Sequence, residues 1–432
     1  MRRRSLVLLL APLALVVFLA VFLGPRLLEE ESPGQEELDR LAEEAVDPGR
    51  VEVWGAWEGA EQEAFEAVLA GYMEAFPGTD VVYVPLGDEL EGRIRAGAAE
   101  GALPDLAILS GTRLAQELAE EGLLLPLHRI EQEAEEPFGE SFVAVGGYGD
   151  QEPYGVMVKP RNESLLWYSA AAYEGAGLEP PADWEELVEG ARGLTASGVP
   201  AYAVPGAEGA ALMDVFEALF LQTGGTDFYD FLLGRNVPWT HETVVAALEE
   251  LARVVGDEES VAGGVEGALS TDLQAAAAQV AGDPPEAAQL LGGEEAGAGT
   301  AGLFPPLGGA GPVAIVTGDQ VVMFRYSRVS EDLMSYLVTD EAIETFTSFG
   351  LPTLARDVDP AIYTDPTTRV AVTGLRDAEA YRYDLSDLLP EELASIEGTG
   401  LLPLFQELVG NPDDAREIAE RMEAVAKQVY QD

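Results

Sequence analysis

Short apolar runs alternate with amphipathic stretches in the first part of the chain's body. Residues 51–54, 81–84 and 106–109 are apolar runs of the length expected for buried strands. After the first run, apolar side chains recur at helical spacing and predict one buried helix face: Phe65, Val68, Leu69, Tyr72 and Phe76. Further helices are expected at 88–100 and 112–121. Repeated strand–helix units predict an α/β fold with a parallel-rich sheet, and such sheets bind ligands beyond the carboxyl ends of their strands.

Helical patterns dominate the middle of the chain. Asp183 and Glu186 form a capping box at the start of an apolar helix face. Further helices are expected at 212–222, 241–255 and 271–281. Residues 313–324 predict a strand, a turn and a second strand, because a glycine and an aspartate interrupt the apolar run.

The composition indicates a folded protein with a strongly acidic surface. The 432 residues suffice for two domains, and 47% of them are hydrophobic, so the net charge of -54 does not indicate disorder. This charge excludes nucleic acid as a partner, because phosphate contacts need a basic face. Lys159 and Lys427 are the only lysines. The acidic, lysine-poor surface suits a high-salt environment, where ions screen self-repulsion; the alternative is an acidic extracellular protein from a high-GC genome.

The residue types that usually hold metals are scarce. The chain has no cysteine, which excludes disulfides and thiolate metal sites. His128 and His241 are the only histidines, and their separation in sequence excludes a local metal pair. We therefore expect no metal and no cofactor.

The N-terminal residues form a membrane-targeting segment. Three arginines at 2–4 precede an uncharged apolar run at 6–23, which suits either a signal peptide or a single-span anchor. Signal-peptide cleavage needs two small residues separated by one position, but Phe18 and Phe22 stand two positions before Ala20 and Gly24. This favours an uncleaved anchor. We expect this anchor at 1–27, an acidic linker at 28–48, and the rest of the chain outside the membrane, at the cell surface.

One segment has an unusual order of elements. From Tyr154 to Leu187 the sequence predicts a strand, a polar turn, a second strand, a short helix and two prolines before a capped helix. Four further motifs occur at plausible spacing: Trp57–Glu61, Pro104–Ala107, Met213–Glu217 and Arg382–Pro390. Together with Gly318-Asp319, these motifs resemble those of the carbohydrate-binding extracellular solute-binding proteins of ABC importers, most closely the alpha-glucoside-binding branch.

The resemblance implies a two-lobe, type II periplasmic-binding-protein-like fold with a cleft and hinge between the lobes. Lobe one is expected at 49–158 plus 314–350, and lobe two at 159–313 plus 351–432. Hinge bending is expected near four residues: Val158, Lys159, Pro312 and Gly350.

The resemblance also implies a set of ligand-binding residues. Carboxylates accept hydrogen bonds from sugar hydroxyls, and aromatic faces cover the apolar side of the ring. The candidates are Trp57, Glu58, Ser110, Thr112, Arg113, Glu208, Asp214, Gly318, Asp319 and Asp384.

Several candidates have a structural alternative. Trp57 is either a platform for the ligand or a core residue, and Trp54, inside a strand, suits the core better. Arg113 either contacts ligand or forms a surface salt bridge. Asp319 either meets hydroxyls or closes an Asx-turn.

The same holds for the late acidic motif. Asp384 and Asp387 either accept hydrogen bonds from ligand or pair with Arg382. Lys159, at the hinge, is expected to pair with a carboxylate across it.

Two departures from the branch bear on the ligand. The loop after the third strand lacks the Pro-Gln-Pro-Gly of the branch, and Ala210 and Val215 stand where the branch carries tryptophans. A smaller or more polar solute, such as a polyol or a compatible solute, is therefore an alternative to a disaccharide.

The resemblance implies a binding protein rather than an enzyme. A monomer would deliver a sugar or sugar-like solute to permease subunits served by a separate ATPase, because this chain has no Walker motif. One alternative is a sensor or surface scaffold of the same fold without a role in transport. The other is an extracellular glycoside hydrolase, which would need a pair of suitably spaced carboxylates. No nucleophile elbow or metal motif supports hydrolysis.

Overall fold

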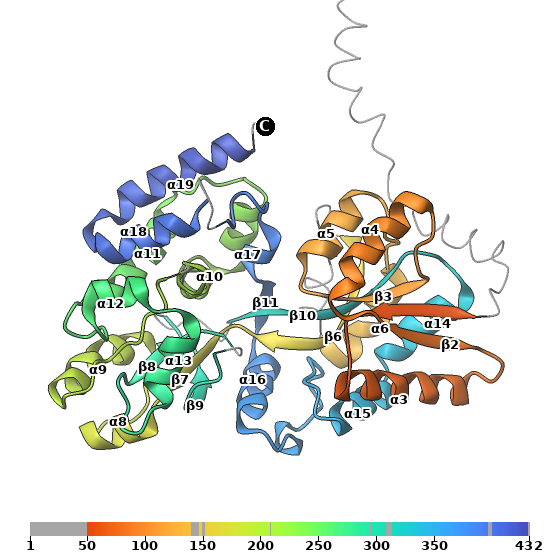
Figure 1. The fold of residues 1–432 in the computed structure, drawn as a ribbon, viewed down its shortest axis with the longest axis horizontal. Helices are drawn as coiled ribbons and strands as arrows, with labels where there is room; N and C mark the ends of the chain where they lie inside the picture. Colours follow the sequence, from red (N-terminus) through yellow and green to blue (C-terminus); the bar gives the residue numbers. More distant parts are fainter. Residues whose placement is uncertain are drawn as a thin grey trace, which may run out of the picture.

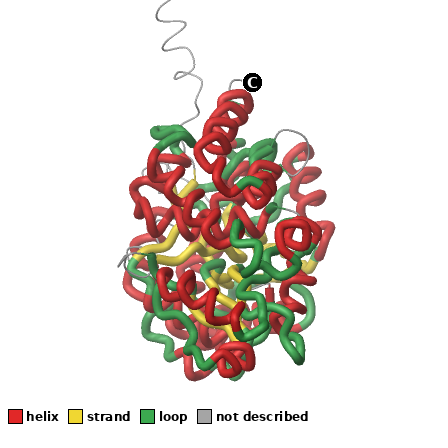
Figure 2. Tube along the Cα trace, turned by 90° about the vertical axis from the view of Figure 1, so that its left-hand side faces the viewer, coloured by secondary structure: helices red, strands yellow, loops and turns green. Residues whose placement is uncertain are grey.

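The computed structural model describes residues 50–139, 147–148, 152–207, 209–293, 296–307, 313–395 and 400–430. Two bodies lie side by side (Figure 1), and strands β6 (Gly155–Asn162), β10 (Val313–Met323) and β11 (Ala380–Tyr383) run between them. We call the body whose core begins at Val51 lobe one, and the body whose core includes Leu166 lobe two. In the perpendicular view, helices enclose the strands (Figure 2).

Lobe one confirms the predicted alternation of strands and helices. Its first elements are β1 (Val51–Gly55), α3 (Ala60–Ala75), β2 (Val81–Pro85), η2 (Gly87–Glu89), α4 (Leu90–Glu100), β3 (Leu106–Ser110), α5 (Arg113–Glu120) and α6 (His128–Phe138). After β10 the chain adds α14 (Arg328–Leu337) and α15 (Asp340–Ser348). Most of the predicted apolar face of α3 is buried, with Phe65, Val68, Leu69 and Tyr72 in the core, but Phe76, just past the end of the helix, is 41% exposed.

The main sheet combines parallel and antiparallel strands. Its order is β11-β10-β3-β1-β2, and β6 pairs with β10. Strand β1 pairs in parallel with β2 and β3, and β10 pairs in parallel with β11 but antiparallel to β3 and β6. The carboxyl ends of β1 and β3 therefore lie at one edge of the sheet, beside the middle of β10.

The turn predicted within residues 313–324 is wrong. β10 is one continuous strand of eleven residues, and Asp319 is paired on both sides rather than placed in an Asx-turn. Gly318 (φ 149°) lies where β6 approaches closely, since a Cβ there would be 2.3 Å from the carbonyl oxygen of Lys159. The glycine therefore permits a close strand contact and not a reversal of the chain.

Lobe two is mostly helical, as its sequence predicts. Its elements are β7 (Leu165–Tyr168), α8 (Ala170–Ala176), α9 (Trp184–Ala196), α10 (Ala210–Leu233), α11 (Glu242–Val255), α12 (Gly264–Ser270), α13 (Leu273–Ala281), β8 (Gln289–Leu291), β9 (Thr300–Leu303), α17 (Leu385–Leu388), α18 (Leu402–Gly410) and α19 (Ala415–Val429). Asp183 caps α9 by accepting from the Glu186 N–H at 2.8 Å. Helix α10 is kinked at Gly225, which has non-helical dihedral angles.

The two hydrophobic cores place one crossing between the lobes later in the chain than predicted. Leu351 and Ala355 pack in the core of lobe one, although the prediction assigns residues after 350 to lobe two. Tyr383 belongs to the same core, whereas Leu385 and the later helices pack in lobe two. Between them, α16 (Pro366–Asp377) lies beside the connecting strands (Figure 1). The packing therefore places the last crossing at the end of β11.

The expected anchor at 1–27 and linker at 28–48 lie outside the described residues. Within the described ranges, no helix combines the length and the apolar character that crossing a membrane requires.

Candidate functional site

The middle of β10 lies at the junction of the two lobes. Asp319 is opposite Ser110, the last residue of β3, and also opposite Lys159 of β6. One residue of β10 thus connects the end of a lobe-one strand with the strand that leads into lobe two.

The loop after β3 is fastened to β10. Gly111 donates its N–H to the carbonyl of Gly318 at 3.0 Å, and its own carbonyl accepts from Gln320 Nε2 at 3.0 Å. Its φ of 71° favours glycine. Ser110, just before this loop, is exposed, whereas Thr112 is fully buried with a hydroxyl oxygen that has no hydrogen-bond partner among the described residues.

Asp319 is held by an indole and an ammonium group. Trp57 Nε1 donates to Asp319 Oδ2 at 2.7 Å, and Lys159 Nζ lies 3.6 Å from the same oxygen. Lys159 also donates to the Glu61 carboxylate at the start of α3. The predicted pairing of Lys159 with a carboxylate is confirmed, but its partners belong to lobe one. Asp319 is therefore a buried carboxylate whose charge is already compensated.

Trp57 is a packed residue in this structure. Its side chain is 3% exposed, and its ring meets Phe65 and Phe346 edge-on, with centroids 6.0 and 6.4 Å apart. Trp54, which its place in a strand assigns to the core, is half-buried, with the Arg93 guanidinium 6.0 Å from its ring centroid. Trp57 is therefore packed more deeply in the core than Trp54, contrary to the expectation from the strand pattern.

On the lobe-two side, carboxylates hold the start of α17. Asp384 caps this helix by accepting from the Ser386 N–H at 2.8 Å. Glu217 of α10 accepts from the Leu385 N–H at 2.7 Å, the Ser386 N–H at 3.2 Å and the Tyr229 hydroxyl at 3.1 Å. Helix α10 therefore fixes the position of α17.

Burial favours the protonated forms of these acids. Desolvation, followed by the charges of Asp384 and Asp214, raises the pKa of Glu217 well above its usual value. Desolvation and the neighbouring Asp387 raise the pKa of Asp384 to about 6, against the opposing hydrogen bonds from Ser386.

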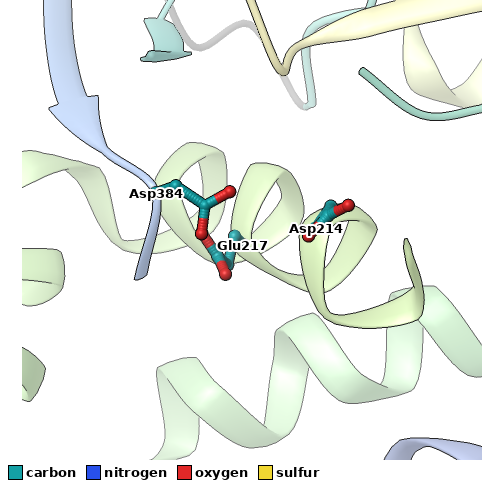
Figure 3. Close-up of side chains that lie close together, drawn as sticks. All are labelled: Asp214, Glu217 and Asp384. Carbon is teal, nitrogen blue, oxygen red and sulfur yellow. The ribbon is translucent and has the colours of Figure 1, made fainter. Parts of the chain in front are cut away.

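Asp214 and Asp384, both predicted from the sequence, lie together with Glu217 (Figure 3). One carboxylate oxygen from each lies within 4.8 Å of the others. This spacing would allow one small cation to reach all three carboxylates. However, the two oxygens of Glu217 already accept three hydrogen bonds, which leaves Glu217 poorly suited to bind a further group.

Two contacts reach α17 from β10 and from lobe one. Arg113 Nη2 donates to the Ser386 carbonyl at 3.1 Å, so the predicted residue Arg113 touches lobe two rather than a surface acid. Thr317 Oγ1 of β10 donates to Asp387 Oδ2 at 2.9 Å. These contacts bring polar groups of both lobes together.

Of the two alternatives for Asp384 and Asp387, pairing with Arg382 does not hold. Arg382 makes a bidentate ion pair with Asp230 of α10, at 2.6 and 2.7 Å. The acids of the late motif are therefore held by α17 and its neighbours and not by the arginine beside them in sequence.

The remaining predicted residues are scattered or outside the described ranges. Glu58 is exposed on the loop after β1. Glu208 and the expected hinge residue Pro312 lie outside the described residues. Val158 is buried in the core of lobe one, and Gly350 (φ 84°) ends α15, far in sequence from the crossing after β11.

Several residues of the junction are absent from the predicted set: Glu61, Glu217, Thr317, Gln320 and Ser386. The sequence could have indicated Glu217, because it is the only charged residue in the apolar run 215–221. A lone carboxylate in such a run must find buried donors when the helix packs. The other four are ordinary polar residues whose partners are distant in sequence.

Two α/β lobes joined by strands, with polar groups converging where they meet, define a protein that binds a solute between its lobes. Residues 56–344 match the model of the bacterial extracellular solute-binding proteins, and the chain belongs to this family. Membership confirms the expectation of an extracellular binding protein rather than an enzyme.

Curated relatives match over most of their length. The osmoprotective compounds-binding protein GgtB of Synechocystis sp. is 27% identical, over 80% of this chain and 85% of that protein. The alpha-glucosides-binding periplasmic protein AglE of Rhizobium meliloti is 27% identical, over 79% of this chain and 80% of that protein.

Solved structures show the same fold. The bacterial solute receptor AcbH superposes with a TM-score of 0.74 at 17% identity, covering 88% of this chain and 99% of that one. A probable secreted solute-binding lipoprotein from Streptomyces coelicolor gives a TM-score of 0.69 at 16% identity, covering 89% and 100%. The predicted two-lobe, type II architecture is thereby confirmed.

Proposed function

We propose that this protein captures a small polyhydroxylated solute, a sugar or a polyol, between its lobes and delivers it to the permease of an ABC importer. Family membership supports the class of function. The names of two relatives support the solute class, since one is named for osmoprotective compounds and the other for alpha-glucosides.

The meeting of both lobes at β10 and α17 carries this proposal. Arg113 and Ser110 from lobe one, and Ser386 and Asp387 from α17, supply donors and acceptors from opposite sides. A sugar or polyol presents hydroxyl groups in several directions and needs such a mixed surface. The two sets already touch through Arg113 and Ser386, so opening of the lobes would separate them to admit a solute, and closure would place them on both sides of it.

The lack of an open ring face at Trp57 favours a small, polar solute. Long glucosides are usually covered by aromatic faces, but Trp57 is packed between phenylalanines and holds Asp319 through its indole N–H. Val215, which takes the place of a tryptophan in the alpha-glucoside branch, is buried. We therefore favour a polyol, a compatible solute or a monosaccharide over a disaccharide.

We propose further that the protein is a monomer tethered to the membrane through residues 1–27 and adapted to high salt. The net charge of -54 supports the salt adaptation, because screening reduces repulsion between carboxylates. If the adaptation is real, the melting temperature should rise with salt. A melting temperature indifferent to salt would contradict it.

A thermal-shift screen of sugars, polyols and compatible solutes, at high and low salt, tests the solute proposal. A ligand at 100 times its dissociation constant adds about 2.7 kcal/mol, which corresponds to roughly 5–10 °C. Asp387→Asn should reduce the shift, while Asp413→Asn, an equal change of charge at an exposed site, should leave it unchanged. A folded protein that shifts with no member of the panel would contradict the proposal.

A further inference from the structure

We propose that lobe two carries a second binding site, for a small organic carboxylate with an apolar or aromatic body, in the cavity between α19 and the loop after α10. The cavity has a volume of about 330 Å³, within the range of small-molecule sites but near its lower end. None of its lining residues belongs to the lobe junction described above.

The loop after α10 presents an arginine from an unusual backbone position. Arg235 has a φ of 57° and is the only non-glycine residue with positive φ among the described residues. It follows the C-cap Gly234, and the Asn236 N–H closes the helix end on the Phe231 carbonyl at 2.7 Å. Glycine is the usual residue in this left-handed conformation at a helix end, because it has no Cβ atom to clash with the backbone. Arg235 is therefore an exception at a position where glycine would be less strained.

That side chain lies over an aromatic ring at the edge of the cavity. The Arg235 guanidinium carbon is 4.5 Å from the ring centroid of Tyr430, near the end of α19. Stacking occupies the face of the guanidinium and leaves its N–H edge for a bidentate acceptor. Within the described ranges, Arg235 has no ion pair with a carboxylate, although the chain contains 78 acidic residues.

The acid in the cavity wall is already engaged. Glu423 accepts from Lys427 Nζ at 2.9 Å with one oxygen and from the Trp239 N–H at 2.8 Å with the other. The charged lining residues are therefore two cations and one carboxylate, an excess of positive charge on a protein of net charge -54. Burial raises the pKa of Tyr430, so its hydroxyl stays neutral and does not repel an anion.

The rest of the wall is apolar. Leu232, Pro238, Trp239 and Ala426 line the cavity, and Trp239 is only 4% exposed. An inorganic anion would satisfy Arg235 but gain nothing from this wall. A carboxylate attached to a ring or a branched aliphatic group would use both parts, with the carboxylate on Arg235 and the body against the apolar wall.

Titration of the full chain with benzoate, at fixed ionic strength, tests the site. We expect saturable benzoate binding by calorimetry. Benzamide, which lacks the carboxylate, and acetate, which lacks the ring, should each bind at least about tenfold more weakly. Failure of benzoate to bind, or equal affinity for acetate, would overturn the proposal.

Arg235→Gly is the decisive variant. Glycine accepts the backbone conformation, so the fold should be retained with an equal or higher melting temperature, while benzoate affinity should fall about tenfold or more. Arg421→Gln, on helix α19 but outside the cavity lining and paired with Glu407, is the control and should bind benzoate normally. Unchanged affinity in Arg235→Gly, or an equal loss in Arg421→Gln, would show that the guanidinium does not form the site. Sugar or polyol binding at the lobe junction should be the same in both variants.

Discussion

Buried carboxylates lie on both sides of the lobe junction, but the two lobes stabilise them differently. In lobe one, Asp319 receives a hydrogen bond from an indole and lies beside an ammonium group. In lobe two, Glu217 and Asp384 receive hydrogen bonds from backbone N–H groups and hydroxyls, and among the described residues no arginine or lysine is bonded to them. The two lobes therefore hold their buried acids in different ways: a cation lies beside the acid of lobe one, whereas burial raises the pKa values of the acids of lobe two.

The two kinds of partner follow from the elements that each acid connects. Asp319 joins β10 to the end of β1 and to β6, where Lys159 is within reach. Glu217 fastens the short helix α17, whose free N–H groups are neutral donors with a partial positive charge. A neutral acceptor would serve that task, and variants of the acids and of their partners distinguish the two arrangements.

Trp57→Ala should have the largest effect, on stability. The change would remove a ring packed between Phe65 and Phe346 and leave the Asp319 carboxylate without its indole donor. We expect a loss of about 3–5 kcal/mol in the free energy of unfolding, measured by urea denaturation. Trp54→Ala, at a half-buried ring, should lose no more than about 2 kcal/mol. Equal losses would show that Trp57 is not a core residue.

Glu217→Ala should be the next most costly change. It would leave the Leu385 N–H and the Tyr229 hydroxyl with one acceptor fewer in a buried site, at a cost of about 3 kcal/mol. Glu217→Gln keeps one acceptor oxygen and replaces the other with an amide nitrogen, and the raised pKa of Glu217 favours its neutral form, so this variant should cost less than the alanine variant, about 1–2 kcal/mol. A glutamine variant as unstable as the alanine variant would indicate that the negative charge is required.

The sequence predicts much of the fold because hydrophobic periodicity is local. The three strands and the helix from Phe65 onward lie where their apolar spacing puts them. The predicted turn at Gly318 failed because glycine in a strand can indicate either a reversal or a close approach of another backbone. The deciding contact, Lys159, is far away in sequence.

The site was harder to predict than the fold for the same reason. Asp214, Arg113 and Asp319 were recognised as residue types that suit a polar site, but their partners come from separate segments. Trp57 shows the limit most clearly, because its burial depends on Phe346, nearly three hundred residues later. A pattern read along the chain cannot distinguish a ring that faces solvent from one covered by a later helix.

The pH dependence of stability tests the raised pKa of Asp384 in lobe two. The pKa of Asp384 is about 6 in the folded protein and about 3.9 in the unfolded chain. Between these values the folded state binds more protons, so its stability should fall as pH rises, by roughly 2–3 kcal/mol in total. Asp384→Asn should remove this contribution, so the difference between wild type and variant should change across pH 4 to 6. Parallel curves would contradict the raised pKa.

Lys159→Met should have the smallest of these effects and should depend on salt. Lys159 is about a quarter exposed, so its contacts with Glu61 and Asp319 are partly screened. We expect a loss of about 1 kcal/mol at low salt that shrinks as salt increases. Lys427→Met, the matched change at the only other lysine, removes an exposed helical pair with Glu423 and should cost at most about 0.5 kcal/mol.

This pair of lysine variants tests the comparison between the lobes directly. If the ammonium group compensates Asp319, its removal leaves a buried carboxylate with only the Trp57 N–H as donor, and Asp319→Asn in the same chain should recover part of the loss. If Lys159→Met instead costs no more than Lys427→Met, and Asp319→Asn recovers nothing, then the indole hydrogen bond alone suffices. Asp319 would then resemble the acids of lobe two, because neutral donors would hold both groups.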